Sequence, residues 1–295
     1  MAHYAVPVKP RPATPAHAAT LVLLRDRPAG GFDVLLMQRH RASKFAAGDF
    51  VFPGGKIEAA DAPADAAAWC AGLGQKDASH VLGLEHAPET ALAHWIGAIR
   101  ETFEEAGILL ARGARGPDPA RLEAYRRACH SDKQAFWTML RTERLTLATD
   151  RLVYFAHWIT PEESPLRFDT RFFAAEMPEG QEASVDGNEL IAIRWLRPRE
   201  AIDAATRGEI SLRNPTVRNL MLFEGAASAA EALGRLVGRS VPTIRPRVLE
   251  EGGKRRVLMP GRATTDRASS AGRSPLRGAR RGRRGERSAS RTRSR

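Results

Sequence analysis

The chemistry of this chain is concentrated in one stretch, Arg100-Glu101-Thr102-Phe103-Glu104-Glu105-Ala106-Gly107-Ile108. Residues 88–106 are predicted to form a helix that Gly107 ends, because apolar side chains recur at helical spacing. These are Leu92, Trp95, Ile96, Ile99 and Phe103. Glu101 stands three residues before Glu104 and four before Glu105. The three carboxylates therefore crowd one side of the helix, at the negative end of its dipole. A divalent cation with oxygen ligands would relieve that repulsion.

An acidic face exposed to solvent, with Arg100 paired to Glu104, is the alternative interpretation of the same stretch. Two features favour a metal site. The carboxylates border the apolar side of the helix at Ile99 and Phe103, and the turn Phe52-Pro53-Gly54-Gly55 lies upstream. Glycines in such a turn allow the backbone to approach a metal ion or a phosphate closely.

The stretch resembles the Nudix box, G-x5-E-x7-R-E-U-x-E-E-x-G-U, in which U is a bulky aliphatic residue. Residues 100–108 match its second half, except that Thr102 and Phe103 reverse the order of the U-x pair. The first half begins at Gly55 and places Asp61 where the family has Glu. Between Asp61 and Arg100 lie 38 residues instead of seven, an insertion of 31 that leaves the role of Asp61 open.

A second pattern is similar to the coenzyme A diphosphatase signature L-L-T-x-R-[SA]-x3-R-x3-G-x3-F-P-G-G. Leu35-Leu36-Met37-Gln38-Arg39-His40, Lys44, Gly48 and Phe52-Pro53-Gly54-Gly55 stand at its spacing, and Met37, His40 and Lys44 depart from it. The resemblance covers about residues 18–261 and points to the branch that includes peroxisomal acyl-CoA diphosphatases and their bacterial relatives.

The resemblance implies that Glu101, Glu104 and Glu105 bind Mg²⁺ or Mn²⁺, with the Gly54 carbonyl as a further ligand. Arg100 is expected to orient Glu101 or Glu104 rather than to contact substrate. A bound divalent ion would neutralise charge on the diphosphate and activate water.

Nudix enzymes often take their general base from a loop outside the box. Glu182 and Glu189 are the candidates, and the alternative for each is an exposed loop acid. Arg39 and Lys44, with Gly54 and Gly55, are expected to bind the phosphates of coenzyme A, and the alternative is a solvated strand end.

Strand and helix patterns alternate irregularly, which predicts an α/β fold with a mixed sheet. The resemblance makes this a Nudix-type α/β/α sandwich with a helical insertion at about residues 62–99 and a C-terminal extension. Residues 1–17 are predicted to be a flexible leader, 18–260 the hydrolase domain, and 261–295 a disordered tail. Expected strands include residues 108–110 and 243–249, the latter forming a hairpin with 254–259, and residues 215–235 are expected to be helical.

The basic charge is concentrated in the predicted tail. Of 46 Lys and Arg residues, 12 lie in residues 261–295 with two acidic residues, so residues 1–260 carry 34 basic and 32 acidic side chains. A nucleic-acid-associated protein that acts through this tail is therefore a competing hypothesis. No bilayer-length apolar run or secretory leader is evident, and Cys70 and Cys129 fit no metal or redox spacing, which favours a cytoplasmic protein.

The expected reaction is metal-dependent hydrolysis of coenzyme A or acyl-CoA to adenosine 3′,5′-bisphosphate and phosphopantetheine or its acyl form. A Nudix hydrolase of ADP-ribose, NADH or a dinucleoside polyphosphate is the first alternative. A Nudix fold kept for ligand sensing would predict damaged carboxylates, whereas the run from Arg100 to Gly107 is intact. The sequence leaves the oligomeric state open.

Overall fold

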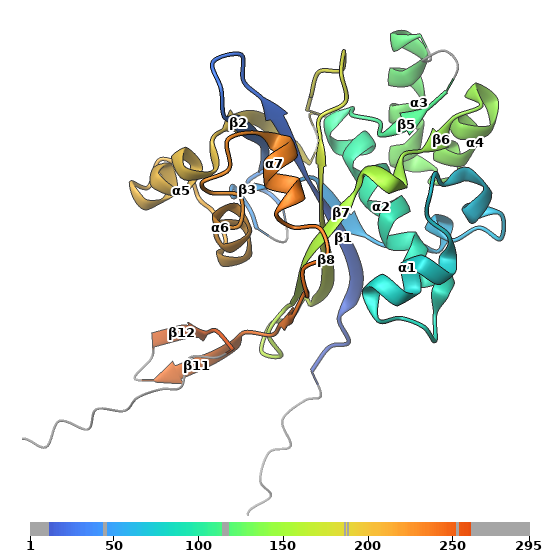
Figure 1. The fold of residues 1–295 in the computed structure, drawn as a ribbon. Helices are drawn as coiled ribbons and strands as arrows, with labels where there is room; N and C mark the ends of the chain where they lie inside the picture. The colour runs from blue at the N-terminus through green and yellow to red at the C-terminus, as the bar shows by residue number, and fades with distance from the viewer. Residues whose placement is uncertain are drawn as a thin grey trace, which may run out of the picture. The chain divides into compact units, whose positions relative to one another are not determined.

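In the computed structural model, strand β1 (Ala16–Asp26) lies inside an eight-stranded sheet. It pairs antiparallel with β2 (Phe32–Arg39) and parallel with β8 (Phe168–Glu176), so the sheet is mixed. The strand order is β10-β7-β8-β1-β2-β3, and β4 also pairs with β1 and β9 with β2 (Figure 1). The remaining strands of this sheet are β3 (Phe50–Val51), β4 (Gly54–Lys56), β7 (Val153–Ile159), β9 (Leu190–Leu196) and β10 (Thr243–Ile244).

The structure describes residues 12–43, 46–113, 118–185, 187, 189–251 and 254–260. The chain divides into two compact units, Met1–Pro260 and Gly261–Arg295, and every described residue belongs to the first. The predicted disorder of the tail therefore falls outside the described residues. The predicted leader, residues 1–17, overlaps β1 at Ala16 and His17, because both residues pair with β8.

Both faces of the central strands are buried, and each face is covered by helices. Leu21 and Leu23 belong to one hydrophobic cluster, while Val22 and Leu24 belong to the other, as the alternation of side chains along a strand requires. Helices α2 (Pro88–Ala106), α3 (Pro119–Ser131) and α4 (Gln134–Glu143) cover the first face. Helices α5 (Pro198–Thr206), α6 (Asn214–Met221) and α7 (Ala229–Gly234) cover the second (Figure 1).

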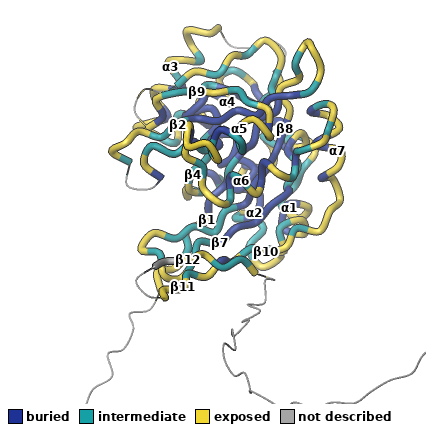
Figure 2. Tube along the Cα trace, turned by 90° about the vertical axis from the view of Figure 1, so that its left-hand side faces the viewer, coloured by how far each residue is buried: buried dark blue, intermediate teal, exposed yellow. Residues whose placement is uncertain are grey.

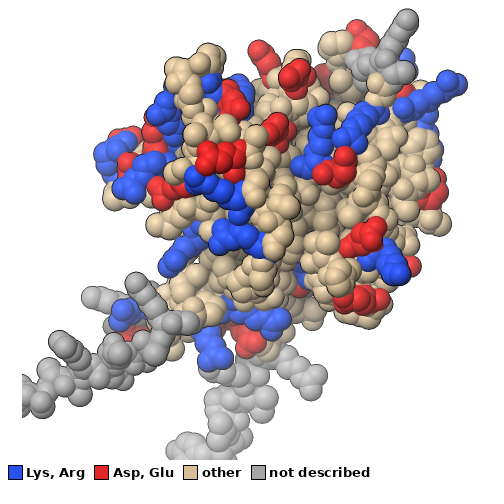
Figure 3. Space-filling model, viewed as in Figure 1, with Lys and Arg blue, Asp and Glu red and all other residues tan. Residues whose placement is uncertain are grey.

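This arrangement confirms the expected α/β sandwich with a mixed sheet. Buried residues concentrate along the strands and the inner sides of the helices, and exposed residues lie on the outer loops (Figure 2). On the face shown in Figure 3, acidic and basic side chains are interspersed, in keeping with the nearly balanced charge of residues 1–260. None of the helices in the described part of the chain has the length and apolar character to cross a bilayer.

The insertion between the two halves of the box packs against the first helical layer. It contains a 3₁₀ turn, η2 (Ala66–Trp69), and helix α1 (Gln75–Leu82), which contacts α2. Asp65 pairs with Arg141 of α4 at 3.0 Å, and the Ala71 amide donates to the Leu147 carbonyl at 2.9 Å. The predicted range of 62–99 also includes the first twelve residues of α2, which begins at Pro88.

Three predicted elements differ in detail. The helix expected over 215–235 is two helices, α6 and α7, separated by a turn at Gly225, where φ is +75°. Residues 108–110 are irregular, and the short strand β5 (Ala111–Arg112) follows and pairs with β6 (Thr146–Leu147). The strand expected over 243–249 is interrupted before Arg247, because Pro246 cannot donate a ladder hydrogen bond. The expected hairpin is confirmed as β11 (Arg247–Glu251) and β12 (Lys254–Leu258).

Candidate functional site

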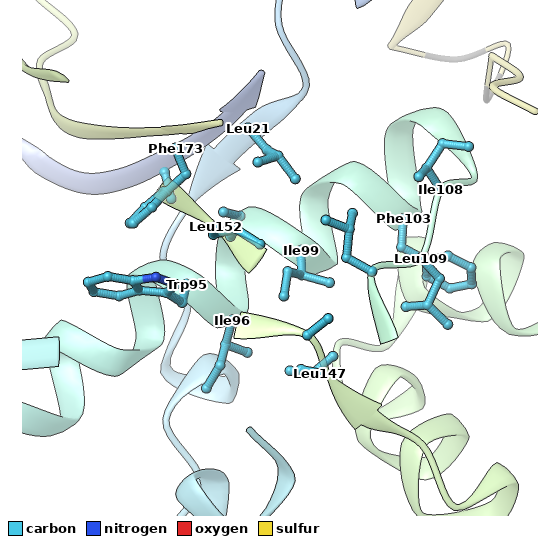
Figure 4. Close-up of a cluster of buried hydrophobic side chains, with 14 of the residues drawn as sticks. Leu21, Trp95, Ile96, Ile99, Phe103, Ile108, Leu109, Leu147, Leu152 and Phe173 are labelled. Atoms are coloured by element: carbon cyan, nitrogen blue, oxygen red, sulfur yellow. The ribbon is translucent and has the colours of Figure 1, made fainter. Parts of the chain in front are cut away.

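Helix α2 is fixed by its apolar side, and this fixes where its carboxylates lie. Ile99 and Phe103 are buried among side chains of the sheet and the following segments, including Leu21, Leu109 and Leu152 (Figure 4). The helix ends at Gly107, whose φ of +70° is left-handed and whose amide donates to the Phe103 carbonyl at 3.0 Å. The packing of the apolar side and the end at Gly107 therefore fix the orientation of the polar side chains in the last turns of α2.

Arg100 connects the acidic side chains of the site. It is 1% exposed, and its Nη1 donates to Glu101 at 2.7 Å and to Glu104 at 3.1 Å. Its Nε and Nη2 donate to the two oxygens of Asp61 at 2.6 and 2.9 Å, and Nη2 also donates to the Lys56 carbonyl at 3.1 Å. These are the contacts of a residue that orients carboxylates, the role expected for Arg100.

Asp61 lies beside Arg100 although 38 residues separate them in the sequence. Its side chain is fully buried, and it also accepts a hydrogen bond from the Glu58 amide at 2.8 Å. The Asp61 carboxylate packs closely against α2 at Gly97, where an added Cβ would stand 3.2 Å from an Asp61 oxygen. A longer side chain at position 61 would therefore have little room. Asp61, whose role the sequence left open, is thus the bidentate partner of Arg100.

The Gly54-Gly55 turn contacts two of the carboxylates closely. The Gly54 amide donates to Glu105 at 2.8 Å, and a Cβ on Gly55 would stand 2.5 Å from the carboxyl carbon of Glu101. Gly54 itself has φ of +156°, and a Cβ there would meet the Ala19 carbonyl oxygen at 2.5 Å. Both positions therefore require glycine.

Burial makes the negative charges of Glu101 and Glu105 costly. Burial raises the pKa of Glu101 to about 7, with Arg100 opposing the shift and Glu104 adding to it. Burial also raises the pKa of Glu105 well above its usual range, and the charge of Glu101 adds to the shift while the Gly54 amide opposes it. Carboxylates held in this state favour a cation among them.

The carboxylates open into a cavity of about 950 Å³. Seven of the predicted site residues line it: Arg39, Gly54, Gly55, Glu101, Glu104, Glu105 and Glu189. Arg39 and Glu189 form a salt bridge at 3.5 Å on its wall. Glu182 is exposed and is absent from the lining, and Lys44 lies outside the described residues.

A family model described as the NUDT19 Nudix domain matches residues 11–222, more than half of the chain. The chain belongs to this Nudix family. It is 28% identical over 270 residues to the human protein named acyl-coenzyme A diphosphatase NUDT19, a match that covers 79% of this chain and 69% of the human one. The chicken protein of the same name is 32% identical over 225 residues, covering 62% of this chain and 59% of that protein.

A crystal structure of a Nudix hydrolase from Alicyclobacillus acidocaldarius shares the fold with a TM-score of 0.62 at 25% identity. The match covers 75% of this chain and 96% of that one. The predicted Nudix hydrolase fold and enzyme class are therefore confirmed.

The predicted donor set, carboxylate oxygens with one backbone carbonyl, would suit a hard divalent cation. Among the described residues, however, no three acidic, His or Cys side chains already converge in a metal-binding arrangement. Arg100 and Lys133 hold oxygens of Glu101 and Glu104. A metal ion would have to compete with these cations for the same oxygens.

Two basic residues of this Nudix site were absent from the sequence prediction. Arg126 of α3 is buried and donates to the Glu104 carbonyl at 2.9 Å and the Glu105 carbonyl at 2.7 Å, which fixes the end of α2. Lys133, just before α4, forms a salt bridge with Glu104 and lines the cavity. No local motif marks either residue, because both reach the site through the packing of α3 against α2 and of α4 against α3.

Proposed function

We propose that this Nudix hydrolase cleaves the diphosphate bond of coenzyme A or acyl-CoA, giving adenosine 3′,5′-bisphosphate and phosphopantetheine or its acyl form. The names of the human and chicken relatives support this substrate class. The chain spans 69% and 59% of these relatives, so the substrate is carried over as a proposal.

One observation carries the proposal: a single cavity joins the buried carboxylates to a broad uncharged wall. At about 950 Å³ it is at the upper end of the range for small-molecule sites, roughly 300–1,000 Å³. A diphosphate alone would fill only the charged end. Coenzyme A esters combine a diphosphate with a long uncharged arm and match both parts.

Glu101, Glu104 and Glu105 would hold Mg²⁺ or Mn²⁺, with the Gly54 carbonyl as a further ligand. When bound, the ion supplies charge neutralisation at the diphosphate and lowers the pKa of a coordinated water. Water adds to one phosphorus, and the bond from that phosphorus to the bridging oxygen breaks. The other phosphate leaves with the bridging oxygen, so the products are two phosphate monoesters.

The side chains of the cavity would position the substrate for that reaction. Arg39 and Lys133 present cations to phosphate oxygens, and Arg100 holds Glu101 and Glu104 in place. Glu189 is the better placed of the two candidate bases, because it lines the cavity and Glu182 does not. The role of Lys44 in phosphate binding stays a prediction.

The test is a substrate panel with the purified full chain and Mg²⁺ or Mn²⁺. Free coenzyme A, a set of its esters, ADP-ribose, NADH and a dinucleoside polyphosphate are compared by kcat/KM. Coenzyme A species are expected to be the best substrates. Faster turnover of ADP-ribose or NADH than of every coenzyme A species would refute the substrate and leave the hydrolase class intact. Binding of nucleic acid by residues 261–295 and a cytoplasmic location stay predictions from the sequence.

A further inference from the structure

We infer that the hairpin β11–β12, with the facing parts of β7 and β8, forms a binding site for the acyl chain of a coenzyme A ester. The inference rests on the proposed function, since it names the part of the substrate that this wall would recognise. It also assigns a role to a segment outside the family match, because the match ends at residue 222 and the hairpin begins at Arg247.

The charged and the uncharged residues that line the cavity come mostly from different parts of the sequence. The charged lining residues come from residues 39–133, 189 and 213, and include the carboxylates of α2. The lining residues from 158–172 and from 246–257 carry no charge. Eight of them are apolar: Trp158, Ile159, Pro161, Phe168, Phe172, Pro246, Val248 and Val257. The lining thus combines a charged part that suits phosphates with an uncharged part that suits hydrocarbon.

The sheet side of this wall is rigid. Phe168, Thr170 and Phe172 are spaced by two along β8 and therefore face the same way. Trp158 of β7 is opposite Thr170 and only 4% exposed, and its indole Nε1 donates to Asn219 at 3.1 Å. A buried ring held by a hydrogen bond gives this side of the cavity a fixed backing.

The hairpin side presents one apolar pair to the cavity. Val248 and Val257 are directly opposite in the antiparallel register, so their side chains share one face, and both line the cavity. Leu249 is opposite Arg256 on the other face and is absent from the lining. Val257 is 53% exposed although it borders a cavity. A hydrocarbon chain lying against Val257 would remove that apolar surface from water.

The acyl chain fits this wall better than the nucleotide does. Adenosine 3′,5′-bisphosphate carries further phosphate charges, and the lining residues from 158–172 and from 246–257 include no cation to pair with them. The acyl chain is joined to the uncharged pantetheine arm, so it can extend away from the carboxylates along the uncharged lining.

The test compares kcat/KM of the full chain for free coenzyme A and for its butyryl, octanoyl and dodecanoyl esters. Each methylene buried on such a wall should raise kcat/KM by up to roughly fourfold. In the nearly isosteric double variant Val248→Thr/Val257→Thr, the ratio of kcat/KM for the dodecanoyl ester to that for free coenzyme A should fall by about tenfold. Leu249→Thr, on the opposite face of the same hairpin, should leave this ratio unchanged.

Equilibrium binding in EDTA gives a second readout that needs no turnover. Dodecanoyl-CoA should bind more tightly than butyryl-CoA, and the double variant should reduce this ratio of affinities by about tenfold while Leu249→Thr leaves it unchanged. Equal kcat/KM and equal affinity for all chain lengths would overturn the acyl site, with hydrolysis of coenzyme A leaving the proposed function standing. A chain-length effect that Leu249→Thr removes as fully as the double variant would also overturn it. Failure to hydrolyse any coenzyme A species would instead refute the proposed function.

Discussion

At the scale of single residues, Glu105 combines burial, a raised pKa and a backbone hydrogen bond from Gly54. Glu105→Gln keeps an acceptor for the Gly54 amide and removes a charge that is costly to bury. We therefore expect kcat to fall by at least roughly 100-fold, because a proposed metal ligand is lost. Thermal stability in EDTA should be equal or higher. A rate close to that of the unchanged chain would refute the metal assignment, and a loss of folding would refute the electrostatic argument.

Lys133 is a cation that already contacts Glu104, so it competes with any metal ion there. Lys133→Met should tighten Mn²⁺ binding in the absence of substrate by about fivefold, the scale of a partly exposed ion pair. The same change should raise KM for the diphosphate substrate, because a cation that lines the cavity is lost.

Calorimetry with Mn²⁺ and steady-state kinetics measure these two opposite effects. Lys133→Arg is the matched control that retains the charge. Lys76→Met removes one positive charge from α1, at a position that does not line the cavity, and should change neither value. Weaker metal binding in Lys133→Met would show that Lys133 supports the metal site rather than competing for it.

At the scale of elements, the ends of α2 were predictable and the contacts between distant elements were not. Apolar periodicity and Gly107 gave the helix its bounds, Pro88–Ala106, because both are local signals. The same reasoning joined α6 and α7 into one helix, since the apolar pattern continues through Gly225, where the chain actually turns.

The candidate site shows the same division. The three carboxylates and the glycine turn are contiguous motifs, and the structure places them around one cavity. Arg126 and Lys133 reach α2 from α3 and the segment before α4, and their contacts depend on packing that no short pattern encodes. Of the two candidate loop acids, the sequence could not distinguish Glu182 from Glu189, because only the path of the loop separates them.

The link between η1 (Ala59–Asp61) and α2 yields a prediction about stability. Asp61→Asn would leave the buried Arg100 guanidinium without its bidentate carboxylate. Removing one partner of a buried ion pair typically costs about 3 kcal/mol or more of the free energy of unfolding. Urea unfolding in EDTA measures this cost without a contribution from metal. Asp65→Asn, which affects an exposed pair with Arg141, is the control and should cost less than about 1 kcal/mol.

At the scale of the whole molecule, a buried histidine makes global stability depend on pH. His94 of α2 is fully buried, with Nδ1 2.7 Å from the Thr90 carbonyl, and burial followed by the charge of Arg171 lowers its pKa to about 3. The unfolded chain takes up a proton near the ordinary value of 6.5, whereas the folded chain does not. At His94 the folded state therefore binds fewer protons, and the contribution of this residue to stability falls as pH drops from about 6.5 toward 3.

The expected slope from His94 is at most about 1.4 kcal/mol for each pH unit below 6.5, and urea unfolding between about pH 7 and pH 5 measures it. His94→Asn retains a donor for the Thr90 carbonyl and cannot titrate, so the free energy of unfolding of the unchanged chain should fall relative to that of the variant by up to about 1.4 kcal/mol for each pH unit below 6.5. The raised pKa of Glu101, about 7, acts with the opposite sign in both proteins and cancels in this comparison. Asp169 acts in a separate range: burial alone would raise its pKa, but its hydrogen bond with His157 and the charge of Arg171 lower it to about 2. Its contribution is lost only as pH falls below about 3.8. An unchanged slope in His94→Asn would show that the stability loss between pH 7 and 5 comes from other groups.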